Sequence, residues 1–266
     1  MKIKKGGNVS RMLEGIPIPD MFRAEQAFDK SHIEPAEIPS IVRKELSRPE
    51  IADTIKPGMS IAITAGSRGV ANVDTITRAI VDFCKERGAD PFIVPAMGSH
   101  GGATAEGQAL LLKGYGITAE TMGCPVRSSM ETVLLGYSEF GKPVYQDRNA
   151  HEADGIIVSC RIKPHNAFRG TYESGICKMM VVGLGKQKGA ESVHSDGLGN
   201  MARNLPANAS MSGRSCSPKS TMRMSGRASI RGLARWMSLH RLCSMRMSIL
   251  CKRDLRLPHY CGSLLC

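Results

Sequence analysis

Residues 60–102 read SIAITAGSRGVANVDTITRAIVDFCKERGADPFIVPAMGSHGG, and this stretch indicates the fold. Ser60–Thr64 and Pro91–Pro95 are short apolar runs, and glycine or proline residues lie close to both ends of each run. Runs of this length and composition are typical of buried strands. The stretch therefore predicts two strands, with enough chain between them for one helix.

A helix is predicted between these two strands, because apolar residues recur there at helical spacing. The residues that share this apolar face are Ile76, Ile80, Phe83 and Cys84. We expect Asp74 to be the N-cap of this helix and Gly88 to be its C-cap. A second helix is predicted after the second strand, with Thr104 as its cap and Leu112 at its end.

The order strand, helix, strand, helix favours an α/β fold, in which helices pack on a mostly parallel sheet. Further strands are predicted at Pro143–Gln146 and Gly155–Ser159, and short helices are expected within residues 1–57. Residues 1–206 are predicted to form this domain. Residues 207–266 show no sustained apolar period and are predicted to form a disordered tail.

The net charge of the chain, +12, is concentrated in its last sixty residues. Residues 207–266 hold eleven Lys or Arg residues and one acidic residue, Asp254, so residues 1–206 carry only +2. The predicted domain therefore lacks the basic surplus that is typical of nucleic-acid-binding domains.

The first residues, MKIKKGG, are not followed by the apolar run of a secretory signal, and no apolar run is long enough to cross a membrane. None of the nine cysteines forms a CxxC pair. Scattered cysteines of this kind fit a reducing compartment better than a disulfide framework. We therefore expect a cytoplasmic protein.

Three polar side chains follow the ends of predicted strands. Arg68, His100 and His165 each lie a few residues beyond a strand. Because ligands of α/β sheets bind beyond the carboxyl ends of the strands, we expect three loops to bring these side chains to one place. A guanidinium can hold a carboxylate or phosphate, and an imidazole can act as a general base. The alternative is a surface arginine and two structural histidines.

Residues 161–197 contain an unusual density of ionisable side chains and glycines. Lys178 lies between Ile176-Cys177 and an apolar run that begins at Met179, so it is predicted to be half-buried. Burial can turn a lysine into a nucleophile or attachment point, although a snorkelling lysine is the alternative. His194 could bind a metal, but a single histidine is weak evidence for a metal site.

Four motifs together resemble the N-terminal domain of the lactate racemase family, the nickel-pincer-dependent racemases and epimerases of 2-hydroxy acids. They are PAMGSHGGATAEGQ, RIKPHNAFRG, YESGICKMM and GLGKQKGA, which occur in this order between residues 95 and 190. The resemblance covers roughly residues 15–205. It implies an isomerase with an α/β N-terminal domain.

The resemblance also implies roles for the residues that match. His100 and His165 would accept and donate a proton on opposite faces of the substrate, while hydride leaves C2 to the cofactor and returns. Ser67 and Arg68 would contact the cofactor, and Arg68 would also bind the substrate. The segment Ala65-Gly66-Ser67-Arg68 departs from the family pattern, which has an aspartate before its Thr-Arg pair, so the particular 2-hydroxy acid stays open.

The implied cofactor is the nickel-pincer nucleotide, nickel pyridinium-3,5-bisthiocarboxylate mononucleotide. Lys178 would carry it covalently, and His194 would bind both the cofactor and its nickel. The implied partners are a small 2-hydroxy acid and the enzymes that synthesise and insert the cofactor, rather than a membrane or a nucleic acid.

The resemblance does not extend into residues 207–266, where members of the family continue into a second α/β domain. The favoured explanation is that these residues are out-of-frame translation, so that half of the active site is missing. A natural basic extension that binds nucleic acid and a small Cys/His metal module are the alternatives. The alternative functions are an inactive truncated product and a non-catalytic domain that binds an anion or nucleotide.

Overall fold

The computed structural model describes residues 7–16, 32–67 and 70–214. The chain divides into two compact units, residues 1–31 and residues 32–266. The described part of the first unit contains the short helix α1 (Asn8–Met12). The second unit contains all the sheets and candidate site residues that the structure describes.

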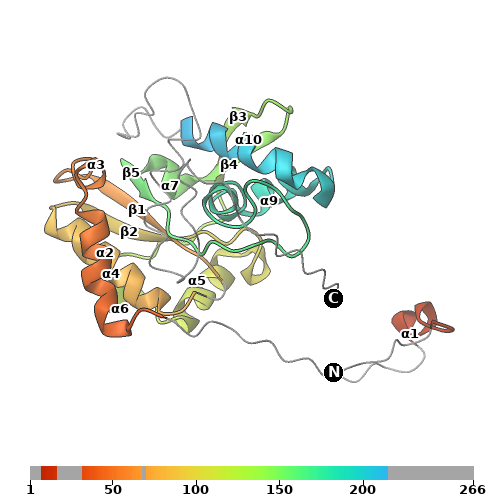
Figure 1. Ribbon diagram of the computed structural model, residues 1–266, viewed down its shortest axis with the longest axis horizontal. Helices are drawn as coiled ribbons and strands as arrows, with labels where there is room; N and C mark the ends of the chain where they lie inside the picture. The colour runs from red at the N-terminus through yellow and green to blue at the C-terminus, as the bar shows by residue number, and fades with distance from the viewer. Residues whose placement is uncertain (1–6, 17–31, 68–69, 215–266) are drawn as a thin grey trace, which may run out of the picture. The chain divides into compact units, whose positions relative to one another are not determined.

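Three parallel strands form the central sheet of the second unit (Figure 1). Their spatial order is β2 (Asp90–Pro95), β1 (Ser60–Ala65) and β5 (Gly155–Ile157), with β1 in the middle. Buried residues occupy five consecutive positions in both β1 and β2. Continuous apolar strands of this kind are typical of a parallel sheet that is covered on both faces. The predicted fold class is therefore confirmed.

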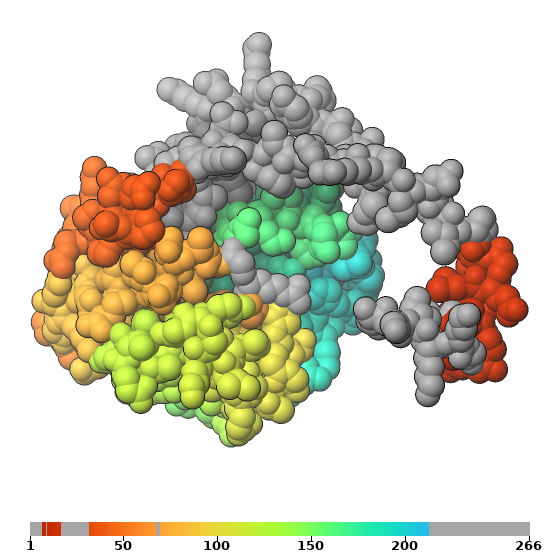
Figure 2. All heavy atoms as spheres, turned by 90° about the horizontal axis from the view of Figure 1, so that it is seen from below, coloured from red at the N-terminus to blue at the C-terminus, as the bar shows by residue number. Residues whose placement is uncertain are grey.

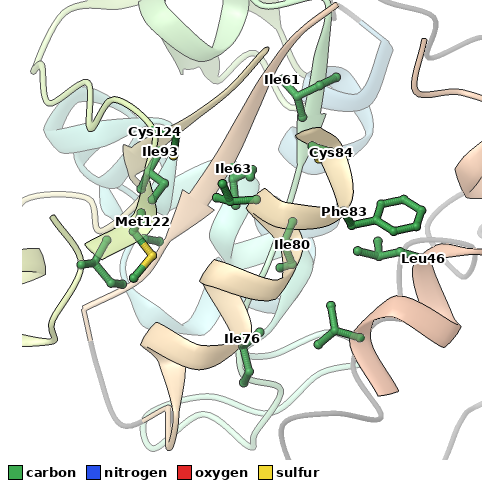
Figure 3. Packing of buried hydrophobic residues seen from close by; sticks show 14 of the residues in the cluster. Leu46, Ile61, Ile63, Ile76, Ile80, Phe83, Cys84, Ile93, Met122 and Cys124 are labelled. Carbon is green, nitrogen blue, oxygen red and sulfur yellow. The ribbon is translucent and has the colours of Figure 1, made fainter. Parts of the chain in front are cut away.

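One face of the sheet packs against helix α4 (Val73–Glu86), and helix α2 (Ile38–Leu46) packs in turn against α4. Alternate residues of β1, Ile61 and Ile63, point into this layer (Figure 3). The helical residues that meet them include Leu46, Ile76, Ile80, Phe83 and Cys84. These include the four residues that the sequence placed on one helical face.

The opposite face of the sheet carries Ala62, Phe92 and Val94, which pack against Ala150 and Leu184. These last two residues belong to chain segments beyond a two-stranded antiparallel sheet, β3 (Thr132–Tyr137) and β4 (Pro143–Asp147). The predicted strand at residues 143–146 is thus confirmed, although it pairs outside the central sheet. The covering of both faces makes the strand ends the accessible part of the sheet.

The remaining described elements are η1 (Pro35–Glu37), α3 (Pro49–Ala52), η2 (Gly101–Ala103), α5 (Ala105–Gly114), α6 (Ala119–Met122), α7 (Arg148–Glu152), α8 (Ile176–Lys178), the π-helical η3 (Met179–Gly183), α9 (Lys186–His194), η4 (Leu198–Asn200) and α10 (Met201–Arg214). Most of them are short, and the longer ones are α5, α9 and α10. Helix α10 continues past residue 206, where the domain boundary was predicted. No helix in the described part of the chain is long and apolar enough to cross a membrane.

Two predicted caps differ from the structure, and one agrees. Helix α4 begins at Val73 after Asn72, so Asp74 lies in the first turn and is not the N-cap. The C-cap is Arg87, and Gly88 follows it with a φ of +74°, a conformation that favours glycine. Thr104 does cap α5, because its hydroxyl accepts a hydrogen bond from the Gly107 N–H.

The third strand is shorter than the sequence predicted, since β5 ends at Ile157 and not at Ser159. The side chain of Thr64 explains this difference. Its hydroxyl accepts a hydrogen bond from the Ser159 N–H at 2.9 Å and donates one to the Ser159 carbonyl at 3.2 Å. A side chain therefore satisfies the backbone groups that a continued strand ladder would use.

Candidate active site

The carboxyl ends of β1, β2 and β5 lie at the same edge of the parallel sheet. The chain continues from these ends into the loops that carry Ser67, His100 and His165. Because β1 is the middle strand, the loops of His100 and His165 leave the sheet on either side of the Ser67 loop. The yellow and green segments that follow β2 and β5 both reach the face shown in Figure 2. Arg68, the other predicted residue here, lies outside the described residues.

Two of these loops are joined by a hydrogen bond between the Ser67 hydroxyl and Nδ1 of His100. The Ser67 loop is held in turn by Tyr115, whose phenol donates to the Ser67 carbonyl. A contact to Nδ1 fixes the ring plane of His100. The sequence predicted Ser67 as a cofactor contact, and the structure gives it a second role as a partner of His100.

The side chain of His165 is held on several sides and is only 8% exposed. Its backbone N–H donates to Glu173 Oε2 at 2.5 Å, and its ring packs against Phe168 with a centroid distance of 4.4 Å. Nδ1 accepts a hydrogen bond from the Ala167 N–H at 3.1 Å. These contacts fix both the orientation and the tautomer of the ring.

Lys178 lies at the end of α8 and is half-buried, as the sequence predicted. Its Nζ is 2.7 Å from Nε2 of His165. The contact joins two ionisable groups, and the protonation of the pair decides which nitrogen donates. A partly accessible lysine amine becomes a nucleophile when it loses its proton.

The surroundings of His165 favour its neutral form. Burial lowers the pKa of His165 below its ordinary value, and the positive charges of Lys178 and Lys163 act in the same direction. Glu173 opposes this shift, and His194 adds a smaller lowering of the pKa. The dependence on His194 indicates that α9 brings this second histidine into the electrostatic surroundings of His165.

His194 ends α9, and its ring Nδ1 donates to the Ala190 carbonyl at 2.6 Å. A carbonyl partner on Nδ1 leaves the lone pair of Nε2 for a metal, which is the arrangement that metal-binding histidines commonly show. Within the described ranges, no three His, Cys, Asp or Glu side chains gather in a group that could hold a metal ion. The residues at this site thus offer one imidazole donor.

The sequence analysis did not single out Glu173 or Tyr115. An isolated backbone bridge between Lys163 and Ser174 folds the loop back on itself, which brings Glu173 to the His165 backbone. Tyr115 comes from the end of α5. No local pattern marks either residue, because each is joined to the site by folding and not by its neighbours in the chain.

Comparison with known proteins identifies the family. The family model described as the lactate racemase N-terminal domain matches residues 18–204, well over half of the chain. The chain therefore belongs to the lactate racemase N-terminal domain family, as its motifs suggested. No match was found among curated proteins.

Proposed function

We propose that this chain contains the cofactor-bearing domain of a nickel-pincer-dependent racemase or epimerase of a 2-hydroxy acid. The observation that carries the proposal is the strand order, which puts the loops of His100 and His165 on either side of the β1 loop. Adjacent strands are about 4.8 Å apart, so the outer two strands are about 10 Å apart. This separation gives room for a small acid with one imidazole on each face.

The residues implied to hold the cofactor suit that task. Lys178 has a partly accessible amine that can form a covalent bond once it loses its proton, and His194 has the Nε2 lone pair that nickel can bind. When bound, the nickel-pincer nucleotide would take up the hydride from C2 and return it. The protein's own contribution is to orient the substrate and to move the hydroxyl proton.

In this proposal His100 and His165 exchange protons with the substrate hydroxyl from opposite sides, and Arg68 binds the substrate carboxylate. Ser67 keeps the His100 ring in place. Nε2 of His165 is bonded to the Lys178 amine in this structure. If Lys178 carried the cofactor, it would no longer be an ionisable partner of His165, and Nε2 of His165 would be left to exchange a proton with the substrate.

Four points stay predictions: the domain division at residue 206, the out-of-frame origin of residues 207–266, the cytoplasmic location, and the cofactor-synthesis enzymes as partners. Translation of the other two reading frames beyond codon 207 tests the out-of-frame origin. We expect one frame to give the apolar periodicity of a second α/β domain, and its absence from both frames would contradict the out-of-frame origin.

The cofactor assignment is tested by expressing the chain together with cofactor-synthesis enzymes. We expect bound nickel and an increase in mass on the peptide that contains Lys178. The Lys178→Met variant is the matched control and should show no increase. An unmodified Lys178 in the wild-type chain, under conditions that load a known member of the family, would overturn the assignment.

The reaction is tested separately, by exchange of the C2 hydrogen in a panel of 2-hydroxy acids. A loaded chain, extended by the second domain if the reading-frame test recovers one, should catalyse exchange, and His100→Ala and His165→Ala should each abolish it. Binding of the cofactor without exchange of the C2 hydrogen would indicate a protein that carries the cofactor but is not a racemase.

A further inference from the structure

The ammonium group of Lys186 lies in the interior, where its side chain is 0% exposed. It donates hydrogen bonds to the Pro95 carbonyl at 2.5 Å and to Gln108 Oε1 at 3.1 Å. It also forms an ion pair with Asp147 Oδ2 at 3.1 Å. The ammonium thus has two hydrogen bonds to oxygen atoms, and the Asp147 carboxylate lies close enough to offset its charge.

These four residues belong to four different parts of the fold, and we call them the Lys186 junction: Pro95, Gln108, Asp147 and Lys186. Pro95 ends β2, Gln108 lies in α5, Asp147 ends β4 and Lys186 begins α9. Asp147 is anchored further, since its backbone N–H donates to the Leu184 carbonyl at 2.7 Å. The side chains of Gln108, Asp147 and Lys186 are all fully buried, so water cannot replace their contacts.

Gln108 connects this junction to the loop of His100. Its Oε1 accepts from Lys186, while its Nε2 donates to the Gly98 carbonyl at 2.8 Å and to the His100 carbonyl at 3.2 Å. One amide therefore joins the buried ammonium to the backbone of a candidate catalytic residue. Apart from the single turn of η2, this loop is irregular, and Gly98, Gly101 and Gly102 all have positive φ angles.

The other end of the junction leads to the segment that holds the cofactor residues. Lys186 lies eight residues after Lys178 and eight residues before His194. The His100 loop and the Lys178–His194 segment also contact each other directly, since the Gly98 N–H donates to the Gly183 carbonyl at 3.3 Å. A Cβ on Gly183 would come within 2.9 Å of the Ala96 carbonyl oxygen, so this close approach requires a glycine.

We propose that Gln108 and Lys186 are positioning residues that hold the His100 loop in register with the Lys178–His194 segment. A buried side chain that hydrogen-bonds to backbone carbonyls specifies one arrangement of its partners, whereas an apolar contact tolerates sliding. Any effect of these residues on catalysis rests on the proposed function, but their positioning of the His100 loop does not.

The experiment compares amide hydrogen exchange in the full chain with that of its Gln108→Met variant. The substitution preserves volume and removes both donors to the loop. We expect exchange at residues 98–104 to increase about tenfold, the effect of losing one or two hydrogen bonds on a local opening. Exchange in α4 should not change. Gln187→Leu, on the exposed face of α9, is the matched control and should leave both regions unchanged.

An unchanged rate at residues 98–104, or an equal increase in α4, would overturn the proposal, because the second result indicates loss of global stability only. If Gln108→Met does not fold, Gln108→Asn keeps a buried amide that is too short to bridge the same groups and allows the same comparison. In a loaded enzyme that catalyses C2 exchange, Gln108→Met should lower kcat with little change in KM. Faster loop exchange in a chain without activity would refute the proposed function and leave the positioning role intact.

Discussion

Lys178 and Lys186 lie eight residues apart in one glycine-rich stretch, yet the fold gives them opposite surroundings. Lys178 is half-buried and contacts the nitrogen of a histidine at 2.7 Å. Lys186 is fully buried and is surrounded by oxygen atoms, one of them from the carboxylate of Asp147. Burial alone therefore does not decide whether a lysine amine reacts or holds the structure together. Its contact partners and its access to solvent decide this.

The backbone between the two lysines explains how they come to differ. The π-helical η3 follows Lys178, and Lys186 has a φ of +54°, which is uncommon for a residue with a side chain. A Cβ on Gly185 would lie 2.0 Å from the Val181 carbonyl oxygen, so the chain can turn here only with glycine. These features direct Lys186 into the interior.

The largest expected effect comes from Lys186→Met, which leaves the Asp147 carboxyl buried without its cation. We expect the free energy of unfolding, measured by urea denaturation, to fall by about 3–5 kcal/mol. The double variant Lys186→Met, Asp147→Asn should recover part of this loss. Lys178→Met should cost only about 1 kcal/mol. Equal losses for the two single variants would remove the distinction between the lysines.

The second expected effect is a difference in chemical reactivity. At pH 7, trace labelling with an acylating reagent should modify Lys178 on the order of 100-fold faster than Lys186, because Lys186 reacts only after local opening. Peptide mass spectrometry gives both rates, and exposed Lys188 reports the dose of reagent. Labelling of Lys186 at the rate of Lys178 would show that the junction is open to solvent.

The smallest expected effect concerns the pKa of His165, which NMR titration of its ring measures. The positive charge of Lys178 contributes to lowering this pKa, so Lys178→Met should raise it, while Lys186→Met should not. Because folding lowers the pKa, His165 favours the folded state above its ordinary pKa and opposes it as the pH falls. A lower pKa in Lys178→Met would contradict the assigned contact.

The central strands and the α4 face could be predicted because their signals are local. Consecutive apolar residues in β1 and β2 and helical spacing in α4 reflect contacts that recur along the chain. The caps at Asp74 and Gly88 were wrong by one or two positions, because several neighbouring residues could serve equally well. The end of β5 was missed because a side chain from another strand, Thr64, replaces the ladder.

The sequence by itself determined the parallel sheet, the loops that carry His100 and His165, and the family to which the chain belongs. Only the tertiary structure decided the partners: Ser67 with His100, His165 with Lys178, and Lys186 with Asp147 and Gln108. The physical reason is that strand and helix patterns arise from neighbours in the chain. The protonation and reactivity of an ionisable group depend instead on the atoms that folding places around it.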